Sequence, residues 1–327
     1  MFKTNIKTLF REILSIPLES ADPDLLAHIS FGFRNLLILA YTMPWVTETL
    51  GDEAAPQALT VRMMEASDRL AKELDKDMTP EDRARCIVYL LHTLCFHYNP
   101  DHMEIAENAA KEVINNVEQA QKASAATAAT AAETAAETSE TAPTAPTATT
   151  PATAETPATE PHQYLSLADS PYLCKILCYD FYFRTEKESR KKAEQLLTKW
   201  AEQLQRDGSW ENVTEDIALQ RLEAYALYAD VADQHKYEKT VRRSLQYYSE
   251  LPRITDEVRF LFLLAHMGRF RNYPEQVEQI MKNVLEGKLS ASATGSISDK
   301  TRNAKPDMLK ALQFHILALY MLNTEQE

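Results

Sequence analysis

Residues 122–161 of this chain contain only lysine, alanine, serine, threonine, glutamate and proline. Apart from proline, no apolar side chain larger than alanine appears, so the stretch cannot bury enough surface to offset the entropy lost on ordering. Its alanine-rich part, 123–136, can extend a preceding helix transiently, but recurrent prolines from Pro143 onward prevent a continuous helix. The sequence therefore predicts a disordered linker.

This linker, 121–162, separates two segments in which larger apolar residues recur. We predict an N-terminal helical segment over 1–120 and a C-terminal helical-hairpin domain over 163–327. A single body of about twelve helices, with the linker as a long surface excursion, fits the same pattern.

Glycine is scarce, with six residues in a chain of 327. The two that lie nearest in sequence are Gly287 and Gly295. Glycine-rich loops that bind dinucleotides or nucleoside triphosphates need closer glycines, as does the nucleophile elbow of serine hydrolases, so these sites are excluded. The abundance of alanine, leucine, glutamate and lysine also argues against a turn-dense all-β fold.

Apolar residues on both sides of the linker recur at three- and four-residue spacing, as on one face of a helix. Near the N-terminus this pattern is set by Ile6, Leu9, Phe10 and Ile13. Asp22 before Pro23 and Thr79 before Pro80 each offer an N-cap followed by proline in the first helical turn. Asp101 is the expected cap of a later helix.

The predicted fold is all-α and has no strand. After the first helix, we expect helices at 23–39, 56–75, 80–98, 101–120, 171–184, 187–206, 214–232, 235–250, 255–267, 272–286 and 305–323. A weak repeat aligns Tyr237-x3-Val241-x3-Leu245 with Tyr273-x3-Val277-x3-Met281, as in stacked helix pairs. We therefore expect antiparallel helical hairpins, forming an α/α-repeat or an incomplete α/α-toroid of about twelve helices.

The net charge of −13 lies mainly in the N-terminal segment and the linker, whereas residues 163–327 are nearly balanced. No large segment is strongly basic, which argues against a nucleic-acid or anionic-membrane partner. The N-terminus lacks the apolar core of a secretory signal, and the longest apolar run, 35–46, is too short to span a bilayer. We expect a soluble, cytoplasmic protein.

One turn has a distinctive composition. Gln205, Asp207, Gly208 and Trp210 follow a predicted helix, and Asp216 opens the next one. This stretch resembles the QW-type turn of α/α-toroid proteins, the helical-barrel fold of terpenoid cyclases and several glycan-active families. The resemblance is confined to about residues 200–231 and implies that the tryptophan packs over a helix end capped by Gly208. The acidic Asp-x-Asp-Asp motif of the cyclases is absent, so their catalytic role is not implied.

The candidate binding or turn residues are Asp207, Gly208, Trp210, Asp216 and Tyr225. The carboxylates among them stabilise a helix start without any catalytic role, so no catalytic residue is assigned. His92, Cys95, Cys174 and Cys178 have the ligand types of a tetrahedral metal site but lack the compact CxxC turns of structural zinc. Buried cysteine packing explains them better, and we expect neither a metal nor a cofactor.

Two functional interpretations remain open, and the first is favoured because no catalytic motif is present. In the first, the chain is a non-catalytic helical scaffold that binds another protein or a peptide. In the second, it is an α/α-toroid enzyme or binding protein that acts on glycans. The sequence does not indicate an oligomeric state.

Overall fold

The computed structural model describes residues 2–138, 164–165, 167, 170–183, 191, 195, 257–266, 270–288 and 306–325. These residues form ten α-helices and three short 3-10 helices, with no strand among them. The prediction of an all-α fold is confirmed for this part of the chain.

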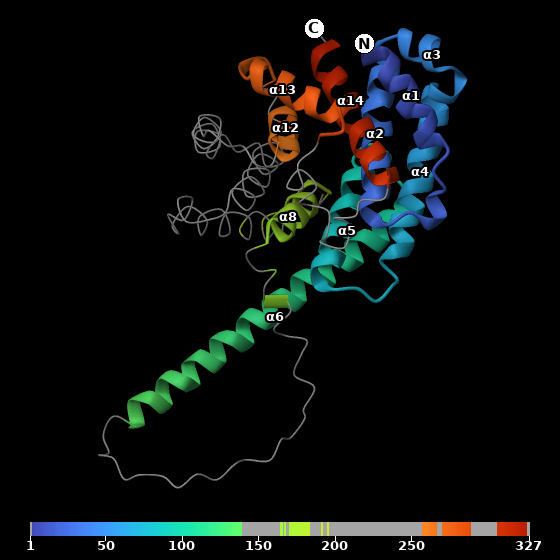
Figure 1. Ribbon diagram of the computed structural model, residues 1–327. Helices are drawn as coiled ribbons and strands as arrows, with labels where there is room; N and C mark the ends of the chain where they lie inside the picture. Colours follow the sequence, from blue (N-terminus) through green and yellow to red (C-terminus); the bar gives the residue numbers. More distant parts are fainter. Residues whose placement is uncertain are drawn as a thin grey trace.

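Six of the described helices precede residue 139 (Figure 1). They are α1 (Phe2–Leu14), α2 (Pro23–Thr42), α3 (Trp45–Leu50), α4 (Pro56–Glu73), α5 (Pro80–Leu94) and α6 (Pro100–Thr138). The other four are α8 (Pro171–Phe183), α12 (Glu257–His266), α13 (Pro274–Leu285) and α14 (Pro306–Glu325). The 3-10 helices are Leu18–Ser20, Asp52–Ala54 and Phe270–Asn272.

Side-chain caps account for several of the helix starts. Asp22 accepts a hydrogen bond from the Leu25 amide at 2.9 Å, and Thr79 accepts one from the Asp82 amide at 3.1 Å, as predicted. The predicted cap of α6 is wrong, because Asn99 rather than Asp101 accepts the hydrogen bonds of the free amides there. Asp101 lies inside the first turn, where its charge still favours the helix dipole.

The main departures from the predicted helices are α3 and α6, while α5 ends at Leu94 rather than at 98. The six-residue helix α3 was not predicted, because it is too short to show a helical period. Helix α6 was expected to end near residue 120 and instead continues to Thr138. Its described side chains from Gln121 to Thr130 are all exposed, and Figure 1 shows this helix projecting away from the other helices. Alanine has the highest helix propensity, so this part of α6 is helical without burying a face.

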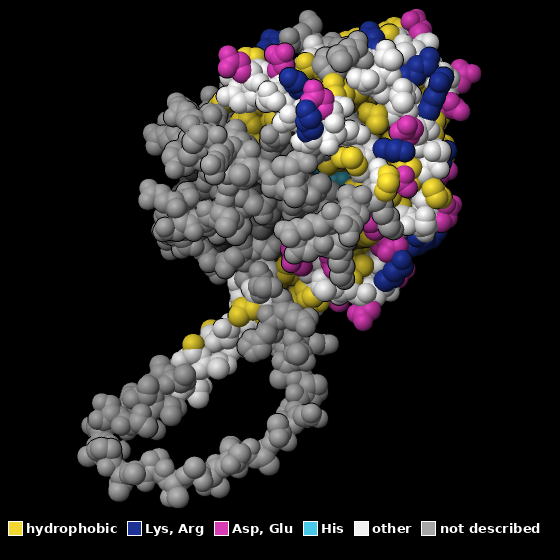
Figure 2. Space-filling view, in the orientation of Figure 1, with side chains coloured by type: hydrophobic (Ala, Val, Ile, Leu, Met, Phe, Trp, Pro, Cys, Tyr) yellow, Lys and Arg dark blue, Asp and Glu magenta, His cyan; other side chains and the backbone are white. Residues whose placement is uncertain are grey.

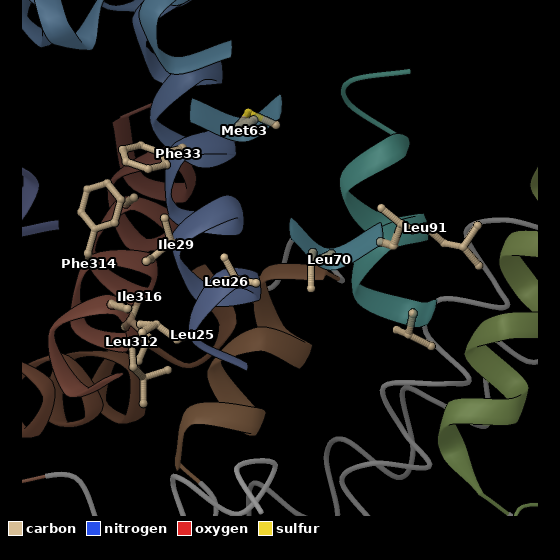
Figure 3. Close-up of a cluster of buried hydrophobic side chains, with 14 of the residues drawn as sticks. Leu25, Leu26, Ile29, Phe33, Met63, Leu70, Leu91, Leu312, Phe314 and Ile316 are labelled. Atoms are coloured by element: carbon tan, nitrogen blue, oxygen red, sulfur yellow. The ribbon is translucent and has the colours of Figure 1, made fainter. Parts of the chain in front are cut away.

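The C-terminal helix α14 packs against the N-terminal helices α1 and α2. Described helices from both sides of residues 121–162 therefore contact one another. Figure 3 shows the apolar side chains at the α2–α14 contact and their continuation towards α4 and α5. The labelled members of this cluster are Leu25, Leu26, Ile29, Phe33, Met63, Leu70, Leu91, Leu312, Phe314 and Ile316.

Phe314 is the centre of the contact between α14, α1 and α2. Its ring lies 6.2 Å from the ring of Phe10 on α1 and 5.6 Å from that of Phe33 on α2, and all three side chains are buried. Gly32 on α2 makes room for it, since a Cβ added there would lie 2.5 Å from Phe314 Cδ1. The missing side chain at Gly32 thus lets α14 lie directly against α2.

Helix α2 is the one described helix that is long and apolar enough to cross a membrane, judged by length and composition alone. Its most apolar window is 61% buried inside the structure, against α4, α5 and α14. Burial of this kind is the usual pattern of a core helix.

We predict that Gly32→Ala lowers the free energy of unfolding by about 1–2 kcal/mol, because overpacking a core costs more than the helix gains from alanine. Urea denaturation measures the change. A Phe314→Ala substitution removes both ring atoms, Cδ1 and Cε1, that the new methyl group would meet. The double variant should therefore lose less stability than the sum of the two single variants. Stabilisation by Gly32→Ala alone would contradict the tight contact.

Candidate functional site

The five residues proposed from the sequence, Asp207, Gly208, Trp210, Asp216 and Tyr225, lie outside the described residues. The turn that resembles the QW type and the predicted cap at Gly208 are therefore not placed, and their roles stay predictions. A positive φ is found instead at Gly51 and Gly287, which follow α3 and α13.

A buried polar network joins α2, α5 and α8. His92 on α5 is hydrogen-bonded through Nε2 to Arg34 Nη1 at 2.8 Å and through Nδ1 to the Tyr179 hydroxyl at 2.5 Å. Because an arginine only donates, His92 accepts at Nε2 and carries its proton on Nδ1, which donates to Tyr179. Burial raises the pKa of Tyr179 well above its usual value, so this hydroxyl stays protonated. One histidine therefore links three helices.

Arg34 places a positive charge inside this network. Burial lowers its pKa to about 10, with Tyr179 and Cys95 partly offsetting that effect, so it stays protonated at neutral pH. The guanidinium carbon lies 3.6 Å from the centre of the Phe96 ring, a cation–π contact. Its Nε atom is buried and has no hydrogen-bond partner within the described part of the chain.

Helices α5 and α8 run in the same direction. Tyr172, early in α8, lies close enough to Arg85 and Tyr89 to affect their pKa values, whereas Tyr179, one heptad later, bonds His92. The two helices therefore end on the same side of the molecule.

Three exposed aromatic residues lie at this shared end, and we call them the aromatic end: Phe96, Tyr98 and Tyr182. Phe96 and Tyr98 follow α5, and their side chains are 43% and 64% exposed. Tyr182 lies in the last turn of α8 and is 53% exposed. Large aromatic side chains are enriched at protein interfaces, so their exposure at the ends of α5 and α8 makes this end the candidate recognition surface.

A second buried group lies at the start of α2. The Asp24 carboxylate accepts a hydrogen bond from the Tyr89 hydroxyl at 2.9 Å and lies 3.5 Å from Arg85 Nε. Burial raises the pKa of Asp24 to about 6, although Arg85 and Tyr89 act in the opposite direction. Tyr89 keeps its proton, because burial raises its own pKa well above the usual value.

Ser67, His102 and Asp68 have the residue types of a catalytic triad. The Ser67 hydroxyl is 2.9 Å from His102 Nδ1, and His102 Nε2 is 2.7 Å from an Asp68 carboxylate oxygen. The Ser67 side chain is fully buried between α4 and α6, so a substrate cannot reach its oxygen. The three residues instead attach the first turn of α6 to α4.

The described residues contain no group of three or more metal-ligating side chains. Cys86 and Cys178 are buried and Cys95 is half-buried, while the side chain of Cys174 lies outside the described set. Burial raises the pKa of Cys86 and of Cys95 to about 12. These two thiols therefore stay protonated, which makes them poor nucleophiles and poor ligands.

The buried contacts of Arg34, Asp24 and Ser67 were not predicted from the sequence, and His92 was named there only as a possible metal ligand, although one signal was present. Helix α2 is strongly apolar, yet it includes Asp24, His28 and Arg34. Polar side chains within a buried apolar helix require partners from other helices, so they mark a polar cluster. Their partners were not predictable, since Arg34 and His92 are 58 residues apart.

Comparison of the chain with known protein families, with curated proteins and with solved structures finds no significant match in any of the three.

We predict that Asp24→Asn changes the pH dependence of stability. The folded-state pKa of about 6 exceeds the unfolded value near 4. The protonated Asp24 side chain is therefore fully compatible with the fold below pH 4, and the folded state loses stability as pH rises through 6 and the buried group ionises. Between pH 4 and 7 the variant should gain about 2–3 kcal/mol relative to the wild type. Urea denaturation of both proteins at each pH tests this, and a difference that does not vary with pH would contradict it.

Proposed function

We propose that this chain is a non-catalytic helical scaffold that binds another protein or a peptide through the aromatic end. The observation that carries the proposal is the exposure of Phe96, Tyr98 and Tyr182 where α5 and α8 both end. Figure 2 gives a second reason, because acidic and basic side chains are interspersed over the described surface in view. A surface on which both signs of charge are mixed does not attract a partner through a large patch of like charge, so aromatic contacts are the better basis for recognition.

The aromatic end is suited to binding because it rests on an ordered base. Phe96 stacks on Arg34, which His92 holds through a hydrogen bond, and His92 in turn binds Tyr179 of α8. Tyr182 packs edge-on against Phe183, with ring centres 5.1 Å apart. Aromatic side chains held in place lose little conformational entropy on binding, which is why such residues dominate binding energy at interfaces.

We propose a non-catalytic protein because the potential nucleophiles among the described residues are buried or protonated. The Ser67 hydroxyl is inaccessible, and the thiols of Cys86 and Cys95 stay protonated. The titratable groups so far described hold helices together, and none of them converges on an open cleft that the described residues form.

We further propose that the helices form successive antiparallel hairpins, as an α/α-repeat or an incomplete toroid of about twelve helices. The α4–α5 contacts support this, since Cys86 donates to the Leu70 carbonyl while Arg83, one turn earlier, donates to that of Leu74. A cytoplasmic location and the absence of nucleic-acid or membrane partners belong to the same proposal. The glycan-binding alternative rests on Asp207–Trp210, which the described residues do not include.

The aromatic end is tested with a double variant, Tyr98→Ser/Tyr182→Ser, and a matched control, Tyr41→Ser. Tyr41 is 72% exposed and lies in the last turn of α2, and it is not one of the three residues of the aromatic end. Each immobilised protein is incubated with native lysate, and the retained proteins are quantified by mass spectrometry. Proteins retained by the wild type and the control should fall about 30–1000-fold with the double variant, since each of the two lost anchors costs about 1–2 kcal/mol.

Circular dichroism first establishes that all three proteins have the same helix content and melting temperature. Equal retention by the double variant and the wild type would contradict the proposal, as would a wild type that retains nothing above empty beads. A glycan array is probed in parallel. Glycan binding that survives the double variant but is lost with Trp210→Ala would support the alternative.

A further inference from the structure

Two histidines meet where α14 packs on α2. Nδ1 of His28 lies 3.1 Å from Nδ1 of His315, and each residue is only 7% exposed. A hydrogen bond between these atoms requires one ring to donate Nδ1–H and the other to accept at a bare Nδ1. The contact therefore requires at least one neutral ring with a bare Nδ1, and when both rings are neutral they must have different tautomers.

The surroundings of the pair are aromatic and positively charged. Phe262 of α12 stacks on His315 with ring centres 4.7 Å apart, and Phe31 of α2 lies 5.6 Å from it. Besides His28, the groups whose charges act on His315 are Arg34 of α2 and His92 of α5. Helices α1, α12 and α13 also pack on α14, and among the side chains that the structure describes on them, no titratable group acts on either ring. No described carboxylate compensates a charge on the pair.

Protonation acts on this contact in two steps. The first proton binds Nε2 of the donating ring and leaves a buried cation near Arg34. The second proton binds Nδ1 of the accepting ring, so two N–H groups and two positive charges then face each other across 3.1 Å. Both steps are unfavourable, and the second also removes the hydrogen bond.

The direction of the pH effect follows from the pKa values. Burial lowers the pKa of His28 to about 4, and burial together with His28, Arg34 and His92 lowers that of His315 well below its usual value. Both values lie below the ordinary pKa near 6.5, so the unfolded or separated state binds more protons. The stabilisation is complete above about pH 6.5. Below that pH, the equilibrium constant that favours packed α14 falls up to tenfold per pH unit for each proton taken up.

We propose that the His28–His315 pair is an acid-sensitive latch, whose protonation releases α14 from α2 while α4 and α5 remain packed. Release is expected to be local because α14 is the last described helix and makes its main contacts with α2 and α1, and smaller ones with α12 and α13. Opening would uncover the apolar face of α2 that includes Leu25, Ile29 and Phe33.

Hydrogen exchange measured by mass spectrometry at pH 7.5 and 5.0, corrected for intrinsic rates, tests the latch. Peptides of α14 and the facing part of α2 should lose at least about tenfold more protection at pH 5.0 than peptides of α4 and α5. The variant His28→Asn keeps an amide group near the Nδ1 position and does not titrate. Its loss of protection at pH 5.0 should be about 10–30-fold smaller than that of the wild type, because the opening of α14 then takes up one proton fewer.

His97→Asn, in the turn between α5 and α6, is the matched control: it removes a different histidine whose pKa burial also lowers, and it should leave the acid response of α14 unchanged. Equal loss of protection in α14, α4 and α5 would overturn the proposal, as would a His28→Asn variant with the full acid response. Should His28→Asn fail to fold, NMR titration of the wild-type ring carbons decides. Both rings should remain neutral down to pH 5.5, and ordinary titration near pH 6.5 in folded protein would exclude the latch.

Discussion

The structure depends on the contact between Phe314 of α14 and Gly32 of α2, which brings the end of the described chain against its beginning. A side chain at position 32 would meet the Phe314 ring at 2.5 Å, so the close approach of the two helices requires glycine there. The same approach brings Phe10 of α1 against Phe314 and places His315 against His28. The long apolar surface of α2 is buried as a result, between α14 on one side and α4 and α5 on the other.

This arrangement also accounts for the polar groups on α2. Asp24, His28 and Arg34 would each be costly to bury alone. Each has a partner outside α2: Tyr89 and His92 of α5 bond Asp24 and Arg34, and His315 of α14 bonds His28. Buried polar contacts add little net stability, but they penalise any packing in which the partners are exchanged. The polar groups of α2 therefore determine which helix faces lie against it, whereas the apolar surface supplies the driving force.

Local signals predicted most of the described helices, and long-range contacts explain what they missed. The helices expected at 187–206, 214–232 and 235–250 lie outside the described residues, apart from residues 191 and 195. The proline and cap at Asp22–Pro23 and Thr79–Pro80 placed the starts of α2 and α5, because these signals act within one turn. The extension of α6 was underestimated, since an alanine helix shows no apolar period. The polar network could not be predicted, because His28 and His315 are 287 residues apart and their pairing depends on tertiary packing. Asp207–Trp210, the stretch with the most distinctive sequence, lies outside the described residues.

The most direct test of this account is an NMR measurement of the Gly32–Phe314 contact. Six glycines in the chain make glycine-selective labelling simple to interpret, and deuteration of the other residues compensates for the mass of 37.1 kDa. The account predicts strong nuclear Overhauser effects between the Gly32 α-protons and the Phe314 ring protons, together with ring-current shifts of those α-protons that disappear in Phe314→Leu. Gly32 α-protons without such effects, in folded protein at pH 7.5, would contradict it.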